Sequence, residues 1–161
     1  MPRFAVIVAT ILLGAPAAAQ TPAPPAAPAA VPGPTLASAE KMLAAARAKA
    51  AELGVAVSCV VVDVHGDLVA AARMDGVGFL TVTVAHGKAR TSALFGQPSG
   101  ALGERGAVLQ SIGAAAGQTV LAVQGALPIV QGGKRVGAIG CSGATSQQDE
   151  DAARAGIAAA Q

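Results

Sequence analysis

The sequence predicts one α/β (α+β) domain, built as a single antiparallel five-stranded sheet with helices on its faces. The expected element order is one helix, two strands, two helices, three strands and a last helix, without repeated strand–helix–strand units. Two turn signals, Asp63–Asp67 and Gly132-Gly133, each join two apolar runs, as the connection of a hairpin does. Residues 35–161 hold these elements, and a chain of that length can fold without a metal or a disulfide.

The first two elements have the clearest patterns. Thr35 is a suitable N-cap for a helix over Leu36–Leu53, where apolar residues recur at spacings of three and four. The run Val55–Val62 is apolar and rich in β-branched residues, which predicts a central strand covered on both faces. The other predicted elements are a strand Leu68–Met74, helices Gly78–Phe95 and Ser99–Ser111, strands Val120–Val123, Leu127–Gln131 and Arg135–Ser142, and a helix Ser146–Ala160 with Ser146 as its N-cap.

The N-terminus has the three zones of a signal peptide. Arg3 supplies the positive charge, Phe4–Leu13 the short apolar stretch, and Ala17–Ala19 a small-residue cleavage site. We therefore expect residues 1–19 to be removed on export to the periplasm or the outside, with no membrane span left in the product. The alternative is a retained anchor, but the apolar run is about half the roughly 20 residues that a spanning helix needs.

Residues 20–34 are almost only Ala and Pro, which predicts an extended linker between the leader and the domain of residues 35–161. The net charge of +2 falls by one unit when Arg3 is removed, and the chain has three Phe, no Tyr and no Trp. Without clustered basic residues or stacking rings, a nucleic-acid partner is not expected. A core made mainly of Ala, Gly and Val gains little from each residue, so we expect contacts in a homo-oligomer to add stability.

Histidine is the usual acid–base group and metal ligand, and the chain has two. His65 lies in the first hairpin turn, where it is either an exposed turn residue or a ligand. His86 belongs to a helical stripe that starts at Phe79 and continues through Val82, Ala89 and Ala93, so it is either a core imidazole or a pocket-lining group. Neither histidine has a second ligand three or four residues away, which gives little support to a zinc site.

Cys59 and Cys141 each fall in a predicted central strand. Export would place them where disulfides persist, and a bond is geometrically available if the two strands are neighbours. The alternative is two buried free thiols that act as small hydrophobic groups.

Charged residues gather near the end of the second strand. Arg73 and Asp75 lie there, and Lys88 lies on the following helix. They form either an anion site for a carboxylate or a structural Arg–Asp pair with an exposed lysine. The sequence has no P-loop, nucleophile elbow, zinc-protease or redox-cysteine motif, so the residues alone indicate no enzyme.

Four blocks of the sequence, taken together, resemble the GlcG/HbpS family. They are VVVDVHGDLVAAARMDG (Val60–Gly76), GKARTSA (Gly87–Ala93), the strands from Leu127 to Gly143, and QDE (Gln148–Glu150). The chain departs from the family pattern at Val64–Gly66 and Cys141, and it lacks the ExxE iron motif of one exported relative. The blocks follow in order from about Leu36 to the C-terminus.

This resemblance implies a profilin-like or PAS-like domain with a central antiparallel sheet. Relatives are commonly oligomeric, several bind haem, and exported ones are linked to haem or iron sensing. The first hypothesis is thus an exported binding protein for haem or a related tetrapyrrole, with Arg73 or Lys88 meeting the propionates. His86 is the first candidate for an axial ligand on chemical grounds, and His65 the second. Arg73, Lys88 and Thr91 match family positions that would line or shape the cleft.

Two further hypotheses stay open. The same cleft would turn over an organic acid if His86 and Asp75 acted as an acid–base pair. Alternatively, the chain is a structural or sensory subunit without a small ligand.

Overall fold

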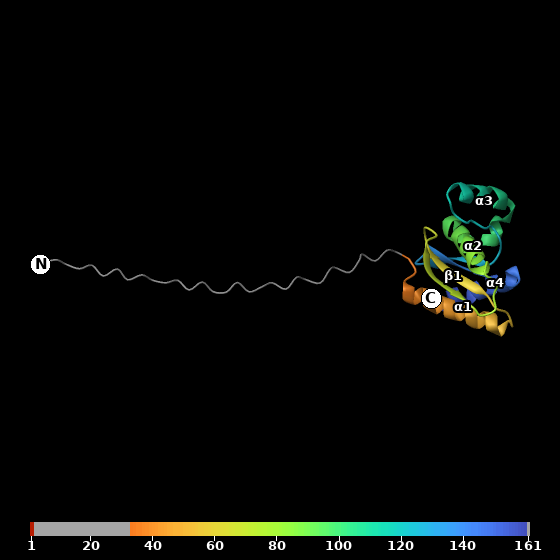
Figure 1. The fold of residues 1–161 in the computed structure, drawn as a ribbon, viewed down its shortest axis with the longest axis horizontal. Coiled ribbons are helices and arrows are strands. Elements are labelled where there is room, and N and C mark those ends of the chain that lie inside the picture. The colour runs from red at the N-terminus through yellow and green to blue at the C-terminus, as the bar shows by residue number, and fades with distance from the viewer. Residues whose placement is uncertain (2–32, 161) are drawn as a thin grey trace. The chain divides into compact units, whose positions relative to one another are not determined.

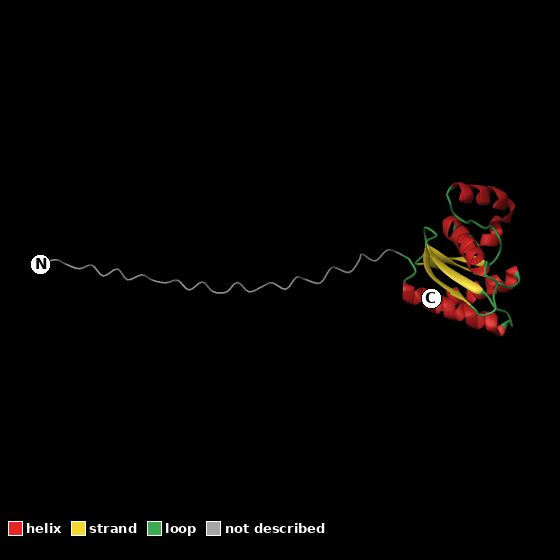
Figure 2. Ribbon diagram, viewed as in Figure 1, coloured by secondary structure: helices red, strands yellow, loops and turns green. Residues whose placement is uncertain are grey.

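The computed structural model describes Met1 and residues 33–160, and these residues form one sheet between two layers of helices (Figure 1, Figure 2). The predicted signal peptide and residues 20–32 of the predicted linker lie outside the described residues, apart from Met1. The elements in chain order are α1 (Leu36–Glu52), β1 (Ser58–Asp63), β2 (Leu68–Arg73), α2 (Thr81–Phe95), the 3-10 helix η1 (Ser99–Arg105), α3 (Gly106–Ala115), β3 (Ala126–Gln131), β4 (Lys134–Ser142) and α4 (Ser146–Ala158).

The sheet is antiparallel and has the strand order β2-β1-β4-β3. The prediction that the first β-branched run is a central strand is confirmed, because β1 lies between β2 and β4 and its first five residues are buried. Each hairpin turn places a glycine at positive φ, Gly66 in the first and Gly132 and Gly133 in the second. The class and sheet type predicted from the sequence are therefore confirmed.

The prediction of five strands is wrong by one. Val120–Val123 is not a strand in the structure. Instead, the backbone N–H of Leu121 donates to the carbonyl of Gly87, and Val120 and Ala122 pack with Leu102 and Leu109 of the η1–α3 hairpin. The segment therefore packs between α3 and α2 and does not join the sheet, because its hydrogen bonds and side chains contact these helices.

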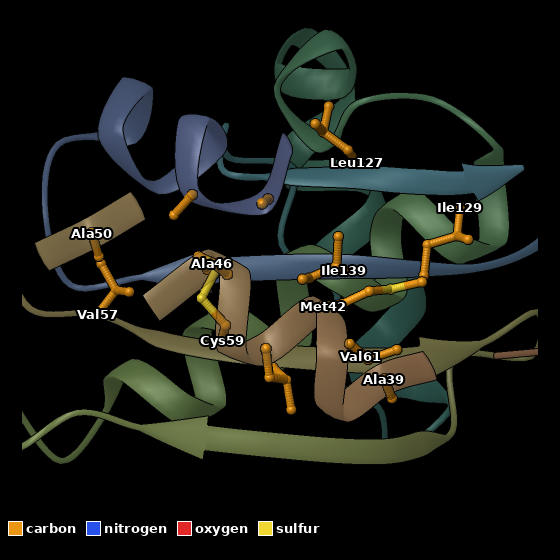
Figure 3. Packing of buried hydrophobic residues seen from close by; sticks show 14 of the residues in the cluster. Ala39, Met42, Ala46, Ala50, Val57, Cys59, Val61, Leu127, Ile129 and Ile139 are labelled. Atoms are coloured by element: carbon orange, nitrogen blue, oxygen red, sulfur yellow. A yellow bond between two sulfur atoms is a disulfide. The ribbon is translucent and has the colours of Figure 1, made fainter. Parts of the chain in front are cut away.

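Alternate residues of the central strands build the two halves of the core. Val61 and Ile139 face α1 and α4, where Met42 and Ala46 pack on them (Figure 3). Val60, Val62 and Ala138 face α2 on the other side. The structure describes no helix in residues 33–160 that is both long enough and apolar enough to cross a bilayer.

The helix caps explain where α1 and α4 begin. The Thr35 side chain accepts from the backbone N–H of Ser38, as the sequence predicts. For α4 the predicted cap, Ser146, is one residue late. Thr145 is the N-cap, and it forms a capping box with Gln148. Asp149 is thus not needed at the cap and is available inside the fold.

Candidate functional site

Helix α2 carries most of the residues that the sequence singled out, and it lies directly on the sheet. A Cβ on Gly140 would lie 2.6 Å from the carbonyl oxygen of Ala85 and 2.8 Å from the backbone nitrogen of Ala89. Only glycine permits this approach. Ala85, Ala89 and Ala93 therefore form the buried stripe, whereas Phe79 is 79% exposed. The predicted stripe through Phe79 and His86 is wrong for this reason, and His86 lies beside the sheet-facing stripe.

His86 is half-buried against the turn between β1 and β2. Its Nε2 lies 3.2 Å from the carbonyl oxygen of Gly66 and 3.1 Å from Nη2 of Arg90. His65, the preceding residue of that turn, is exposed, and its backbone N–H donates to Oδ1 of Asp63. The fold thus brings the turn that carries one histidine against the helix that carries the other.

The surroundings of His86 favour its neutral form. Burial is the main cause that lowers its pKa from the ordinary value of 6.5, and the nearby Arg90 guanidinium lowers it further. The Gly66 carbonyl and the Asp67 carboxylate act in the opposite direction, but the net shift is downward. At neutral pH the imidazole therefore keeps a free lone pair, which is the form that binds a metal.

Arg90 is the residue of this site that the sequence analysis missed. Its Nε lies 3.2 Å from the Gly66 carbonyl oxygen, and its Nη1 donates to the carbonyl of Thr119 at 3.3 Å. Its position four residues after His86 on a helix was the available signal, since such residues lie on one face. We call His86, Arg90, Gly66 and Thr119 the His86–Arg90 site.

An open pocket of about 420 Å³ adjoins this site at Thr119, and it is lined by Gln110 and Ala114 of α3 and by residues 117–121. Its lining includes Thr119 and Leu121, and both pack against Gly87, where a Cβ would lie 2.9 Å from Cδ1 of Leu121. Arg90 reaches the edge of the pocket through its bond to Thr119. The site thus combines a neutral imidazole, a cation and adjoining space.

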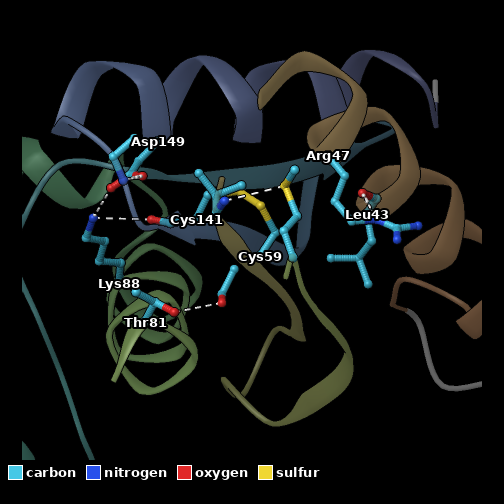
Figure 4. The surroundings of a disulfide bond; sticks show 11 residues. Leu43, Arg47, Cys59, Thr81, Lys88, Cys141 and Asp149 are labelled. Carbon is cyan, nitrogen blue, oxygen red and sulfur yellow. Dashed lines mark hydrogen bonds and ion pairs between the residues drawn. A yellow bond between two sulfur atoms is a disulfide. The ribbon is translucent and has the colours of Figure 1, made fainter. Parts of the chain in front are cut away.

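Lys88 and Thr91 belong to the interior, which corrects the expectation that they line a cleft. Lys88 is 3% exposed, and its Nζ lies 2.9 Å from Oδ2 of Asp149 and 3.2 Å from the carbonyl oxygen of Cys141 (Figure 4). Thr91 is fully buried, donates to the Gly87 carbonyl and accepts from the N–H of Leu121. Both side chains therefore hold α2 to its neighbours and do not present a group to a ligand.

Arg73 and Asp75 are exposed at the opposite end of β2 from the His86 turn. The six residues of β2 put about 17 Å of extended chain between the two ends. The Arg73 guanidinium donates to the Val77 carbonyl from both Nε and Nη2, and a shallow pocket of about 270 Å³ adjoins Asp75. The predicted ligand residues thus do not form one cluster.

Cys59 and Cys141 are paired residues of the neighbouring strands β1 and β4, and a disulfide joins them on the buried face of the sheet that packs against α1 and α4 (Figure 4). Within the described part of the chain, no three His, Cys, Asp or Glu side chains are grouped so that they could hold a metal ion.

Known proteins resemble this chain over nearly the whole described domain. A family model described as haem degrading protein HbpS-like matches residues 35–158. An uncharacterized 15.0 kDa protein of Citrobacter freundii, from the dhaT-dhaS intergenic region, is 35% identical over 118 residues, which make up 71% of this chain and 83% of that protein.

Solved structures show the same fold. A double mutant of HbpS from Streptomyces reticuli is 33% identical, with a TM-score of 0.71 over 89% of this chain and 97% of the other. A PduOC–haem complex is 26% identical, with a TM-score of 0.70 over 79% of this chain and 94% of the other. The ORFY protein of Klebsiella pneumoniae is 29% identical, with a TM-score of 0.68 over 78% and 88%. The family match and the fold together show that this chain belongs to the HbpS-like family.

Proposed function

We propose that this chain is an exported protein that binds haem or a related tetrapyrrole, and that it serves in the sensing or handling of haem or iron. The observation that carries the proposal is the neutral imidazole of His86, held beside Arg90 on α2. The family supports the ligand class, since one member of similar fold, PduOC, was solved with haem.

The residues of the His86–Arg90 site fit such a group. Haem iron binds axial nitrogen ligands and small molecules, and a neutral imidazole at His86 has one ring nitrogen with the lone pair that such a bond requires. Nη2 of Arg90 lies 3.1 Å from Nε2 of that imidazole, whereas Arg73 and Lys88, the cations expected to meet the propionates, make their contacts elsewhere in the fold.

Export and assembly are further parts of the proposal. The Cys59–Cys141 disulfide supports export, because such bonds persist in oxidising compartments. Helix α3 supports a homo-oligomer, because it has no charged residue, and Val108 and Ile112 are each 59% exposed on its outer side. Sedimentation of the purified protein as a stable monomer would count against the oligomer.

The geometry does not favour the alternative of an enzyme for organic acids. That hypothesis needs His86 and Asp75 to share a substrate, and β2 separates the two ends where they lie. An acid and a base that act on one small molecule must both be within hydrogen-bond reach of it.

Hemin titration of the purified protein tests the proposal. We expect a saturable change in the Soret band that ends at a fixed ratio of hemin to chain. A change that rises linearly without saturation, equal to that of a protein without a haem site, would show that the chain does not bind haem specifically.

A further inference from the structure

The contacts at Nε2 of His86 place two conflicting demands on one nitrogen. The Gly66 carbonyl oxygen, 3.2 Å away, can only accept a proton, so this contact requires an N–H at Nε2. Nη2 of Arg90, 3.1 Å away, can only donate a proton, so this contact requires a lone pair at Nε2. One protonation state cannot satisfy both.

The rest of the site decides between these states. Every N–H of the Arg90 guanidinium can only donate, so Nη2 presents a donor to Nε2. The Gly66 carbonyl has a second donor, Nε of Arg90 at 3.2 Å, and does not depend on the histidine. If Nε2 carries the lone pair, both Gly66 and the guanidinium are satisfied. If Nε2 carries a proton, two donors face each other and one arginine N–H loses its partner.

A glycine makes room for this arrangement. A Cβ on Gly66 would lie 2.7 Å from Cγ of Arg90, and the residue has φ +83°. The arginine thus extends across the turn in space that a side chain would fill. Its third contact, from Nη1 to the Thr119 carbonyl, fixes the guanidinium from the other side.

We propose that Arg90 caps the lone pair of His86 Nε2, fixes the imidazole as the Nδ1–H tautomer, and must move away before an iron can bind that nitrogen. Arg90 is thus a positioning residue. It keeps Nε2 of His86 unprotonated, and in the free protein it covers the lone pair of that nitrogen. Only the last step rests on the proposed function. The tautomer and the cap are properties of the free chain.

The first test measures the tautomer without any ligand. Long-range ¹H–¹⁵N spectra of the purified protein assign the protonated nitrogen of each of the two histidines. We expect an unprotonated Nε2 for His86, whereas exposed His65 serves as the internal control. In Arg90→Leu, His86 should shift to the Nε2–H tautomer, bonded to Gly66, and its pKa should rise. In Arg90→Lys, which keeps the charge, the pKa should stay closer to the native value. An Nε2–H tautomer in the native protein would overturn the proposal.

The second test measures the block. Thermal melting first confirms that Arg90→Leu and Arg90→Lys fold. We expect Arg90→Leu to bind hemin about ten- to a hundredfold more tightly than the native protein, because no charge-assisted hydrogen bond has to break. Equal hemin affinities of the native protein and both variants would overturn the block. If no form binds hemin while the tautomer still shifts in Arg90→Leu, the cap stands and the proposed haem function fails.

Discussion

Breaking the buried ion pair between α2 and α4 should strongly destabilise this domain. Lys88 and Asp149 are 3% and 2% exposed and join through a 2.9 Å contact. In Asp149→Ala the ammonium keeps only the Cys141 carbonyl among its two partners in the native protein. Removal of one member of such a pair leaves a buried charge without compensation and costs about 3–5 kcal/mol.

Urea denaturation, followed by circular dichroism, measures this cost. With a slope of about 2 kcal/mol per molar, the midpoint of Asp149→Ala should fall by roughly 2 M. Arg154→Ala is the matched control, because it breaks the other ion pair of α4, whose arginine is 63% exposed. That variant should lose less than about 1 kcal/mol. Equal losses in the two variants would refute the reasoning that burial makes the Lys88–Asp149 pair important.

Three other predictions concern the histidine, the disulfide and the helix–sheet contact. Because the pKa of His86 in the folded chain lies below 6.5, the unfolded chain binds a proton at this residue first as the pH falls. The free energy of unfolding should therefore be highest above pH 6.5 and decrease below it. The same pH series on His86→Ala should show a smaller decrease. Thiol titration in denaturant without reductant should find no free thiol, and two titratable thiols would exclude the disulfide. Because the two cysteines are 82 residues apart, reduction of the bond should lower the free energy of unfolding by up to about 4.5 kcal/mol. Gly140→Ala should lose about 1–3 kcal/mol of folding stability in melting experiments, because its Cβ would meet the α2 backbone. The control Gly103→Ala should lose less, because the nearest neighbour of its Cβ would be 3.8 Å away.

Local patterns in the sequence were enough to predict most of the fold. The central position of β1 followed from a continuous β-branched run, and the two hairpins from turn residues. Val120–Val123 has the same composition as a strand, yet it is not one. The bond from Leu121 to Gly87 of α2, far away in the sequence, decides its role, and no local pattern contains that information.

The candidate site was harder to predict, because long-range partners define it. The sequence around Lys88 is compatible with an exposed cation, because its partner Asp149 lies 61 residues later in the chain. Arg90 was not predicted as a site residue, because its role depends on a contact with the Gly66 carbonyl, 24 residues earlier in the chain. The role of His86 as a ligand stays a prediction, and its tautomer depends on both Gly66 and Arg90.

The central claim, that His86 is the group that binds a tetrapyrrole iron, is tested most directly by hemin titrations of His86→Ala and His65→Ala in parallel with the native protein. We predict that His86→Ala loses the native Soret position and at least tenfold in affinity, while His65→Ala keeps both. A His86→Ala variant with the native Soret band and native affinity would contradict the account.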